Sequence, residues 1–159
     1  MNTMNEESNN LIIRKPSEFG QLLDYIHDEF FNPQDIKYIR SAKIIEIPYR
    51  RIFHGGQSHV IKNRILRKEL EVDVLRCLLR IKHVECYKFT YKADFGEYSF
   101  NELQYDAKSN QLIFIGCEPW ELRINITEIL IENEELGYRG KAKIIKGLLA
   151  ESYSGKTYD

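Results

Sequence analysis

Between Ile44 and Ile131, several stretches of the chain place apolar residues at alternate positions, with charged and polar residues between them. A period of two places one set of side chains on one face of a strand and the other set on the opposite face. One face of such a sheet has to be covered by a core, and antiparallel strands tolerate water on the other face. The alternation therefore predicts a mainly β (α+β) protein, either an antiparallel β-sandwich or a partly closed barrel.

One segment before the sheet has a helical period. Its apolar residues are spaced by three and four, which lines one side of a helix. They are Phe19, Leu22, Leu23, Ile26 and Phe30. Ser17 can act as the N-cap, and Pro33 disfavours helical geometry in the residue before it. We expect one amphipathic N-terminal helix that ends near Phe31 and packs against the sheet.

The first strand of the sheet is expected from Lys43, and Pro48 favours an edge position for it because proline lacks a ladder donor. The segment from His54 to His59 contains two glycines and is predicted as a loop. Residues 75–91 keep apolar side chains at odd positions, which predicts two strands with a bend. Residues 72–81 also fit a helical period, so a helix there is the alternative.

The clearest hairpin joins residues 98–105 to 112–117 through the polar turn 106–111. A half-buried strand is expected from Trp120 to Thr127, and a change of parity at Ile129 indicates a bulge or bend. Residues 141–150 fit neither period, so they are either a last strand or a short helix.

Length and composition favour one ordinary domain. The 159 residues are 43% apolar and 30% charged, and no apolar run approaches the roughly 20 residues that a membrane helix needs. The polar start of the chain, with Glu6 and Glu7, does not look like a secretory signal. We expect a disordered tail over 1–12, a single β-rich domain over 13–159 and a cytoplasmic protein.

Three cysteines form no C-x-x-C pair, which suits a reducing compartment. They are Cys77, Cys86 and Cys117. Each is expected as a small buried hydrophobic residue, since free cysteine is among the most buried residue types. Cys86 lies between His83 and Lys88 and comes nearest to the cationic setting of a reactive thiol.

Charge is unevenly distributed along the chain. Residues 1–36 carry two basic and seven acidic side chains, 37–92 fourteen and five, 93–137 two and ten, and 138–159 five and two. The simplest interpretation is that neighbouring strands match opposite charges. The alternative is a positive patch that meets an acidic protein partner. Its candidate residues are Arg50, Arg51, Arg64, Arg67 and Lys68.

A second group of candidate residues lies farther along the chain. His83 and Glu85 are two apart, so on one strand they point to the same face about 7 Å apart. In a cleft they would form an acid/base pair, with Tyr87 and Tyr91 as ligand-binding neighbours. The alternative is a bend near His83 that leaves both side chains in solvent.

Other chemistry has weaker support. His54 and His59 would add to a metal shell only through a weak loop spacing, and His27 with Asp28 lacks the further ligands of a metal phosphohydrolase. No phosphate-loop pattern occurs, so neither a metal nor a cofactor is predicted. Nucleic acid is an unfavourable partner, because the aromatic residues of 87–91 and its lysine fall on opposite strand faces.

Three stretches resemble a family of small uncharacterised bacterial proteins, a domain of unknown function. They are Leu-Leu-Asp-Tyr-Ile-His-Asp-Glu-Phe-Phe at 22–31, Asp35-Ile36, and Ile-Pro-Tyr-Arg at 47–50. The resemblance implies a recurrent fold over most of the domain and assigns no catalytic residues. Small bacterial immunity and accessory proteins are similar in size and style.

The leading functional hypothesis is a non-enzymatic module that binds another protein or itself through charged strand faces. The alternative is a small-molecule-binding barrel or small hydrolase that uses a pocket of His83, Glu85 and tyrosines. Neither hypothesis involves a membrane.

Overall fold

The computed structural model describes residues 10–52, 59–64, 67–91, 97–117, 119–147 and 151–154. These residues form a mainly antiparallel β structure with a single short α-helix, which confirms the predicted fold class. In chain order the elements are β1 (Leu11–Ile13), the 3₁₀ turn η1 (Pro16–Glu18), α1 (Phe19–Ile26), β2 (Phe30–Phe31), η2 (Pro33–Asp35), β3 (Lys37–Ile39), β4 (Ile44–Ile52), β5 (His59–Arg64), β6 (Arg67–Ile81), β7 (Val84–Tyr91), β8 (Tyr98–Asp106), β9 (Gln111–Gly116), β10 (Trp120–Ile126), β11 (Ile131–Gly147) and β12 (Glu151–Ser154).

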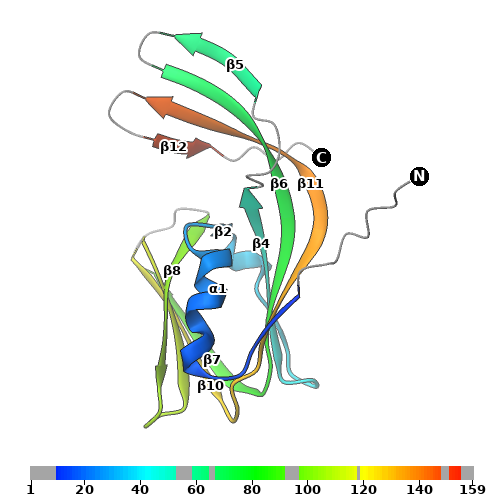
Figure 1. Cartoon of the computed structure of the whole chain (residues 1–159). Helices are drawn as coiled ribbons and strands as arrows, with labels where there is room; N and C mark the ends of the chain where they lie inside the picture. Colours follow the sequence, from blue (N-terminus) through cyan, green and yellow to red (C-terminus); the bar gives the residue numbers. More distant parts are fainter. Residues whose placement is uncertain are drawn as a thin grey trace, which may run out of the picture.

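The strands follow the order β1-β11-β6-β4-β2-β8-β9-β10-β7. We call β1, β11, β6, β4 and β3 sheet A, and β8, β9, β10 and β7 sheet B. The short strand β2 joins them because it pairs with β4 on one side and β8 on the other. The two sheets face each other and α1 lies across the opening between them (Figure 1). The sheet does not close into a barrel.

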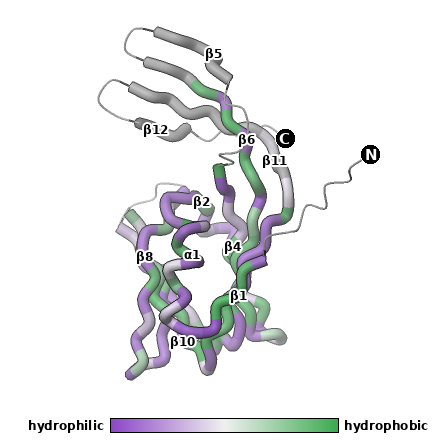
Figure 2. Tube along the Cα trace, in the orientation of Figure 1, coloured by the Kyte–Doolittle hydropathy of each residue, from purple (hydrophilic) through white to green (hydrophobic). Residues whose placement is uncertain are grey.

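One core fills the space between the sheets. Ile47 and Leu79 of sheet A and Leu122 and Ile124 of sheet B are fully buried in the same cluster. The helix adds Leu22 and Ile26, both fully buried, to this core. Hydrophobic and hydrophilic segments alternate along the strands of this part of the chain (Figure 2). Buried and more exposed residues alternate along β4 and β10, so the period of two in these strands corresponds to an inner apolar face and an outer, more polar face.

The helix ends earlier than predicted. It stops at Ile26, its N-terminal flanking residue is Glu18 rather than Ser17, and Asp28 takes a positive φ of 62°. Phe31 then enters β2, and its ring lies 4.6 Å from the ring of Phe100, centroid to centroid. The expected end near Phe31 was wrong because burial of this ring between the two sheets outweighs the local helical spacing.

The predicted edge position of β4 was also wrong. It pairs with β6 over Ile45–Ile52 and, on its other side, with β3 over Ile44–Glu46 and with β2 over Tyr49–Arg50. Pro48 falls in the gap between the β3 and β2 pairings. A proline inside the sheet is tolerated where one neighbouring strand is interrupted.

Other expectations have mixed outcomes. The hairpin β8–β9 and strand β10 are confirmed, and Asn110 in the hairpin turn takes φ 51°. Residues 72–81 are a strand, so the helical alternative is wrong. Parity changes near Ile129 because β10 ends at Ile126 and β11 begins at Ile131, and the connection contains a bend at 127–128, which confirms the expected bend and excludes a bulge within one strand. Most of 141–150 continues β11 as far as Gly147, which settles that segment as strand.

The start of the chain and the loop after β4 are only partly described. Strand β1 begins at Leu11, inside the expected tail, while residues 1–9 lie outside the described residues. Most of the loop predicted from His54 to His59 also lies outside them, and His59 itself begins β5. The sequence pattern did not predict β5.

Strands β6 and β11 extend beyond the two-sheet body, flanked there by β5 and β12 (Figure 1). Two register shifts in β11 lie at the base of this extension, between Glu135 and Gly137 and between Tyr138 and Gly140. Gly137 takes φ 100° and Gly140 φ 158°. Bulges of this kind bend a strand and increase its twist, so they account for the departure of the β6–β11 ribbon from the body.

Candidate partner-binding edge

Strand β7 continues β6 after a short turn in which His83 takes φ 58°. Val84 pairs with Ile126 and Cys86 with Asn125, so Glu85 is the extra residue of a bulge. Because of this bulge, Tyr87 returns to the inner face, opposite Ile124. The apolar residues at odd positions in 75–91 thus lie on the inner face in both strands. The predicted bend falls at His83, whereas the sequence pattern did not reveal the bulge at Glu85.

The structure does not bring His83 and Glu85 into one pocket. The His83 Nε2 atom lies 3.6 Å from a Glu128 carboxylate oxygen, whereas Glu85 accepts a 2.8 Å hydrogen bond from Lys43 Nζ. The four side chains are between 42% and 66% exposed, so neither pair is enclosed. A catalytic role for His83 and Glu85 stays a prediction, and this geometry gives it no support.

The backbone of β7 presents a regular set of donors and acceptors at the end of sheet B. The Ile126 N–H donates to the Asn110 carbonyl at 3.0 Å, so even-numbered residues of β10 turn their polar groups toward β9. Odd-numbered residues of β10 then bond to β7, where their partners are the even-numbered residues. The N–H and C=O groups of Tyr87, Phe89 and Tyr91 therefore face away from β10.

The first part of this outer side of β7 is covered by the chain itself. The Val84 N–H donates to the Lys43 carbonyl at 2.9 Å. The Tyr38 hydroxyl, from β3, lies 3.1 Å from both the Val84 and Glu85 carbonyl oxygens and donates to them. From Tyr87 to Tyr91 no strand among the described residues pairs with this side. We call residues 87–91 the open edge.

The open edge carries a row of three aromatic side chains on the inner face: Tyr87, Phe89 and Tyr91. Tyr87 is 39% and Tyr91 53% exposed, while Phe89 is half-buried. The Phe89 ring lies 5.8 Å from Trp120, and the Tyr91 ring 6.2 Å from Tyr98. The row is the solvent-facing margin of the core, and we refer to it below as the aromatic row.

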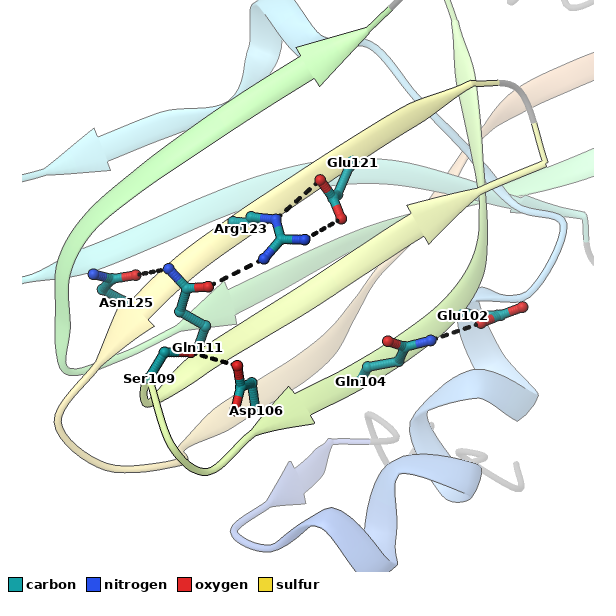
Figure 3. A network of polar contacts seen from close by, with 8 residues as sticks. All are labelled: Glu102, Gln104, Asp106, Ser109, Gln111, Glu121, Arg123 and Asn125. Carbon is teal, nitrogen blue, oxygen red and sulfur yellow. Dashed lines mark hydrogen bonds and ion pairs between the residues drawn. The ribbon is translucent and has the colours of Figure 1, made fainter.

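The outer face of sheet B carries a polar network that is satisfied internally (Figure 3). Arg123 binds both carboxylate oxygens of Glu121 at 2.9 and 3.0 Å and also donates to Gln111 at 3.3 Å. Lys88 of β7 stands directly opposite Arg123 on this face. Within the part of the chain that the structure describes, Lys88 is exposed and makes no ion pair. It therefore places an unneutralised charge in the middle of the open edge.

Charges on sheet A behave differently. Arg80 of β6 donates to Glu134 of β11 at 2.7 Å and lies 3.9 Å from Glu46 of β4. Lys82 lies 2.8 Å from Glu132 in the same way. Opposite charges pair across neighbouring strands, diagonally between β6 and β11 and directly between Arg80 and Glu46, which confirms the predicted cross-strand matching for these residues.

The five residues predicted for a basic partner patch lie in two separate places, on β4 and on the β5–β6 hairpin. Arg50 is buried and paired with Glu97, and Arg51 donates to Glu135 at 3.1 Å. The remaining three lie on the β5–β6 hairpin, where Arg64 pairs in register with Arg67 and Lys68 follows. The structure thus commits Arg50 and Arg51 to internal carboxylates instead of an exposed patch. Binding by the hairpin residues stays a prediction.

A small pocket of about 200 Å³ lies where β2 and η2 meet β4. It is lined by Phe30, Phe31, Asn32, Asp35, Pro48, Tyr49, Arg50 and Glu97. The predicted His83, Glu85, Tyr87 and Tyr91 are not among these residues. This pocket therefore gives no support to the hypothesis of a ligand site formed by His83, Glu85 and the two tyrosines.

A buried polar cluster occupies the inner face of sheet A near the end of α1. Glu29, 9% exposed, accepts the Ile52 N–H at 3.2 Å, and burial raises the pKa of its carboxyl to about 7 against the lowering effect of Arg51. The Tyr49 hydroxyl donates to Asn133 at 2.6 Å. Burial also raises the pKa of the Cys77 thiol to about 11, so this thiol is a poor nucleophile at neutral pH.

Cys86 and Cys117 are exposed, so the expectation that all three cysteines are buried was wrong for these two. In the ranges described, no three His, Cys, Asp or Glu residues gather as metal ligands would. The ring nitrogens of His27, for example, contact Asp28 and Asn101. None of the described helices has the length and apolar character needed to span a bilayer.

Comparisons of the chain with protein families, curated proteins and solved structures found no match. The resemblance to small bacterial proteins therefore stays a prediction. The residues of the open edge were only partly predicted from the sequence. Tyr87 and Tyr91 were predicted, whereas the outward backbone and the unpaired Lys88 follow from strand order.

Proposed function

We propose that the protein is a non-enzymatic binding module that receives an extended segment of another protein as an additional strand on β7. The observation that carries this proposal is the open edge itself. It offers three N–H and three C=O groups, from Tyr87, Phe89 and Tyr91, in the alternation that a partner strand needs.

The side chains of the edge support the same proposal. An edge strand invites unwanted pairing, and proteins commonly limit this risk with proline, charge, bulges or a covering segment. The start of β7 has such protection from the Glu85 bulge and the Tyr38 hydroxyl. Of these devices, residues 87–91 have the charge of Lys88 but no proline and no bulge, and their aromatic row would give a docked strand an apolar surface next to the core.

The test uses a synthetic neutral peptide, Val-Thr-Ile-Thr-Val with glycine and serine flanks, titrated into the ¹⁵N-labelled protein. We expect saturable amide shift changes centred on residues 87–91. The Tyr91→Pro variant removes an outward N–H at a position where an edge strand tolerates proline, and should weaken binding about fivefold or more. Tyr91→Phe keeps both the N–H and the ring and serves as the matched control.

Two results would refute the proposal. One is a titration with no shift changes at 87–91 at millimolar peptide. The other is equal binding by Tyr91→Pro and Tyr91→Phe, because strand addition requires the backbone groups of the edge.

A further inference from the structure

The charge on the open edge constrains which segment fits it. We infer, on the basis of the proposed function, that the partner segment runs antiparallel to β7 and carries an acidic residue opposite Lys88, with apolar residues opposite the aromatic row. This inference assigns the chemistry of the partner, whereas the proposed function concerns only its conformation.

The orientation follows from the surrounding sheet. The pairings of β7 with β10, of β10 with β9 and of β9 with β8 are all antiparallel, and antiparallel ladders are slightly more stable per residue than parallel ones. In an antiparallel segment the residue opposite Phe89 exchanges both of its backbone hydrogen bonds with Phe89. The residues opposite Tyr87 and Tyr91 do the same, so a five-residue segment makes up to six bonds with the edge.

The side-chain pattern of the segment follows from the two faces of β7. Tyr87, Phe89 and Tyr91 lie on the inner face, in register with Ile124, Leu122 and Trp120 of β10. A segment residue opposite each of them is next to the core and should be apolar. Residues opposite Lys88 and Thr90 lie on the outer, hydrated face and should be polar.

The acidic preference comes from the state of the charges on that outer face. Arg123, the neighbour of Lys88 on β10, is already neutralised by Glu121. Lys88 is the charge next to the open edge that has no carboxylate partner in the described part of the chain. A carboxylate directly opposite it in the added strand would form a favourable cross-strand pair, and a lysine there would be repelled.

A second copy of the chain meets this requirement less well. If two β7 strands paired antiparallel about Phe89, each Lys88 would face Thr90 of the other copy. The two Lys88 side chains would then be diagonal neighbours, about 7–8 Å apart on one face, and no carboxylate of either β7 would lie between them. An acidic segment of a different protein removes that repulsion.

The test uses three peptides that differ only in the fourth residue, Val-Thr-Ile-X-Val, where X is glutamate, threonine or lysine. In the antiparallel register this residue faces Lys88. At low ionic strength we expect the glutamate peptide to bind about threefold more tightly than the threonine peptide, and the lysine peptide about threefold more weakly. The differences should shrink at high salt because the charges are exposed.

The Lys88→Glu variant reverses the charge at this position, and because Lys88 is exposed we expect the variant to fold like the wild type. The order of the glutamate and lysine peptides should invert on this variant. A fourth peptide, Val-Glu-Ile-Thr-Val, places its acid opposite Thr90 if the strand is antiparallel and opposite Lys88 if it is parallel. It should bind no more tightly than the threonine peptide.

The outcomes separate this inference from the proposed function. Equal affinities for all peptides at residues 87–91 would overturn the acidic preference while leaving strand addition intact. Tighter binding of Val-Glu-Ile-Thr-Val would overturn the antiparallel orientation. Concentration-dependent shifts of the same amides without peptide would overturn the choice of a different protein in favour of a second copy. No shifts at 87–91 with any peptide would refute the proposed function itself.

Discussion

The outer face of sheet A and the edge of sheet B both alternate charged with apolar residues, but their charges have different surroundings. On sheet A, Arg80 sits between Glu134 and Glu46, so each strand supplies the counter-charge of its neighbour. At β7, Lys88 has a neutralised neighbour on one side and no strand on the other. A charged residue in an alternating strand thus has a structural role where strands continue on both sides, and is available for recognition where the sheet ends.

The largest expected difference between the core and the edge concerns aromatic residues. Phe31 is buried at the junction of the sheets, so Phe31→Ala should lower the free energy of unfolding by about 3–5 kcal/mol. Tyr91 is half exposed, and Tyr91→Ala should cost less than about 1 kcal/mol while weakening peptide binding. Urea unfolding of both variants measures these losses in the free energy of unfolding. Similar losses for the two would place Tyr91 in the core instead of at a binding surface.

The buried cluster of sheet A should make stability depend on pH. The pKa of Glu29 rises from about 4.5 to about 7 on folding. An acid with a raised folded pKa binds more protons in the folded state, so the free energy of unfolding falls as pH increases through this window. The loss should be on the order of 2–3 kcal/mol, given about 1.4 kcal/mol per pH unit.

The control for this prediction is Glu29→Gln, which is neutral at every pH. The difference in unfolding free energy between wild type and Glu29→Gln should change between pH 4.5 and 7.5, while binding at the open edge does not. A difference that is constant over this range would mean that the Glu29 carboxyl has the same pKa in the folded and unfolded protein, which would contradict the predicted pH dependence.

The covered and open parts of β7 can be compared through Tyr38. Tyr38→Phe keeps the ring that packs 5.5 Å from Tyr87 but removes the hydroxyl that donates to the Val84 and Glu85 carbonyls. We expect a loss of about 0.5–1.5 kcal/mol in unfolding free energy. Amide exchange at Val84 should also become faster. An unchanged exchange rate would show that this hydroxyl does not hold the start of β7 in place.

The smallest expected effects concern the charges themselves. A double-mutant cycle of Arg80→Met and Glu134→Gln should give a coupling free energy of about 0.5–1 kcal/mol, because the pair is partly exposed. Lys88→Met should change the unfolding free energy by less than about 0.3 kcal/mol, since Lys88 has no ion partner to lose. A larger loss for Lys88→Met would indicate that Lys88 has an ion partner within the protein. It would then not be an unneutralised charge at the open edge.

The sequence predicted much of the fold and less of the site. Alternation identified β10 and the β8–β9 hairpin, because each has one dry and one wet face. It missed the short strand β2, where the helical spacing of Phe30 continued that of α1. It also placed Pro48 at an edge, because an interruption between β3 and β2 cannot be read from a local pattern.

The site depended on information that a periodic pattern does not contain. Alternation alone placed Tyr87 and Tyr91 on one face, but it could not show that β7 ends the sheet. Strand order also decides whether Lys88 faces a neighbour or solvent. The bend near His83, considered as an alternative from the sequence, separates that residue from Glu85 and leaves them with different partners.

Amide hydrogen exchange along β7 in the free protein tests the open edge most directly. Because even-numbered residues bond to β10 and odd-numbered ones face outward, we expect slow exchange at Cys86, Lys88 and Thr90 and fast exchange at Tyr87, Phe89 and Tyr91. Addition of Val-Thr-Ile-Glu-Val should slow the second set and leave the first unchanged. Uniform slow exchange from 86 to 91 in the monomeric protein without peptide would contradict the proposed edge.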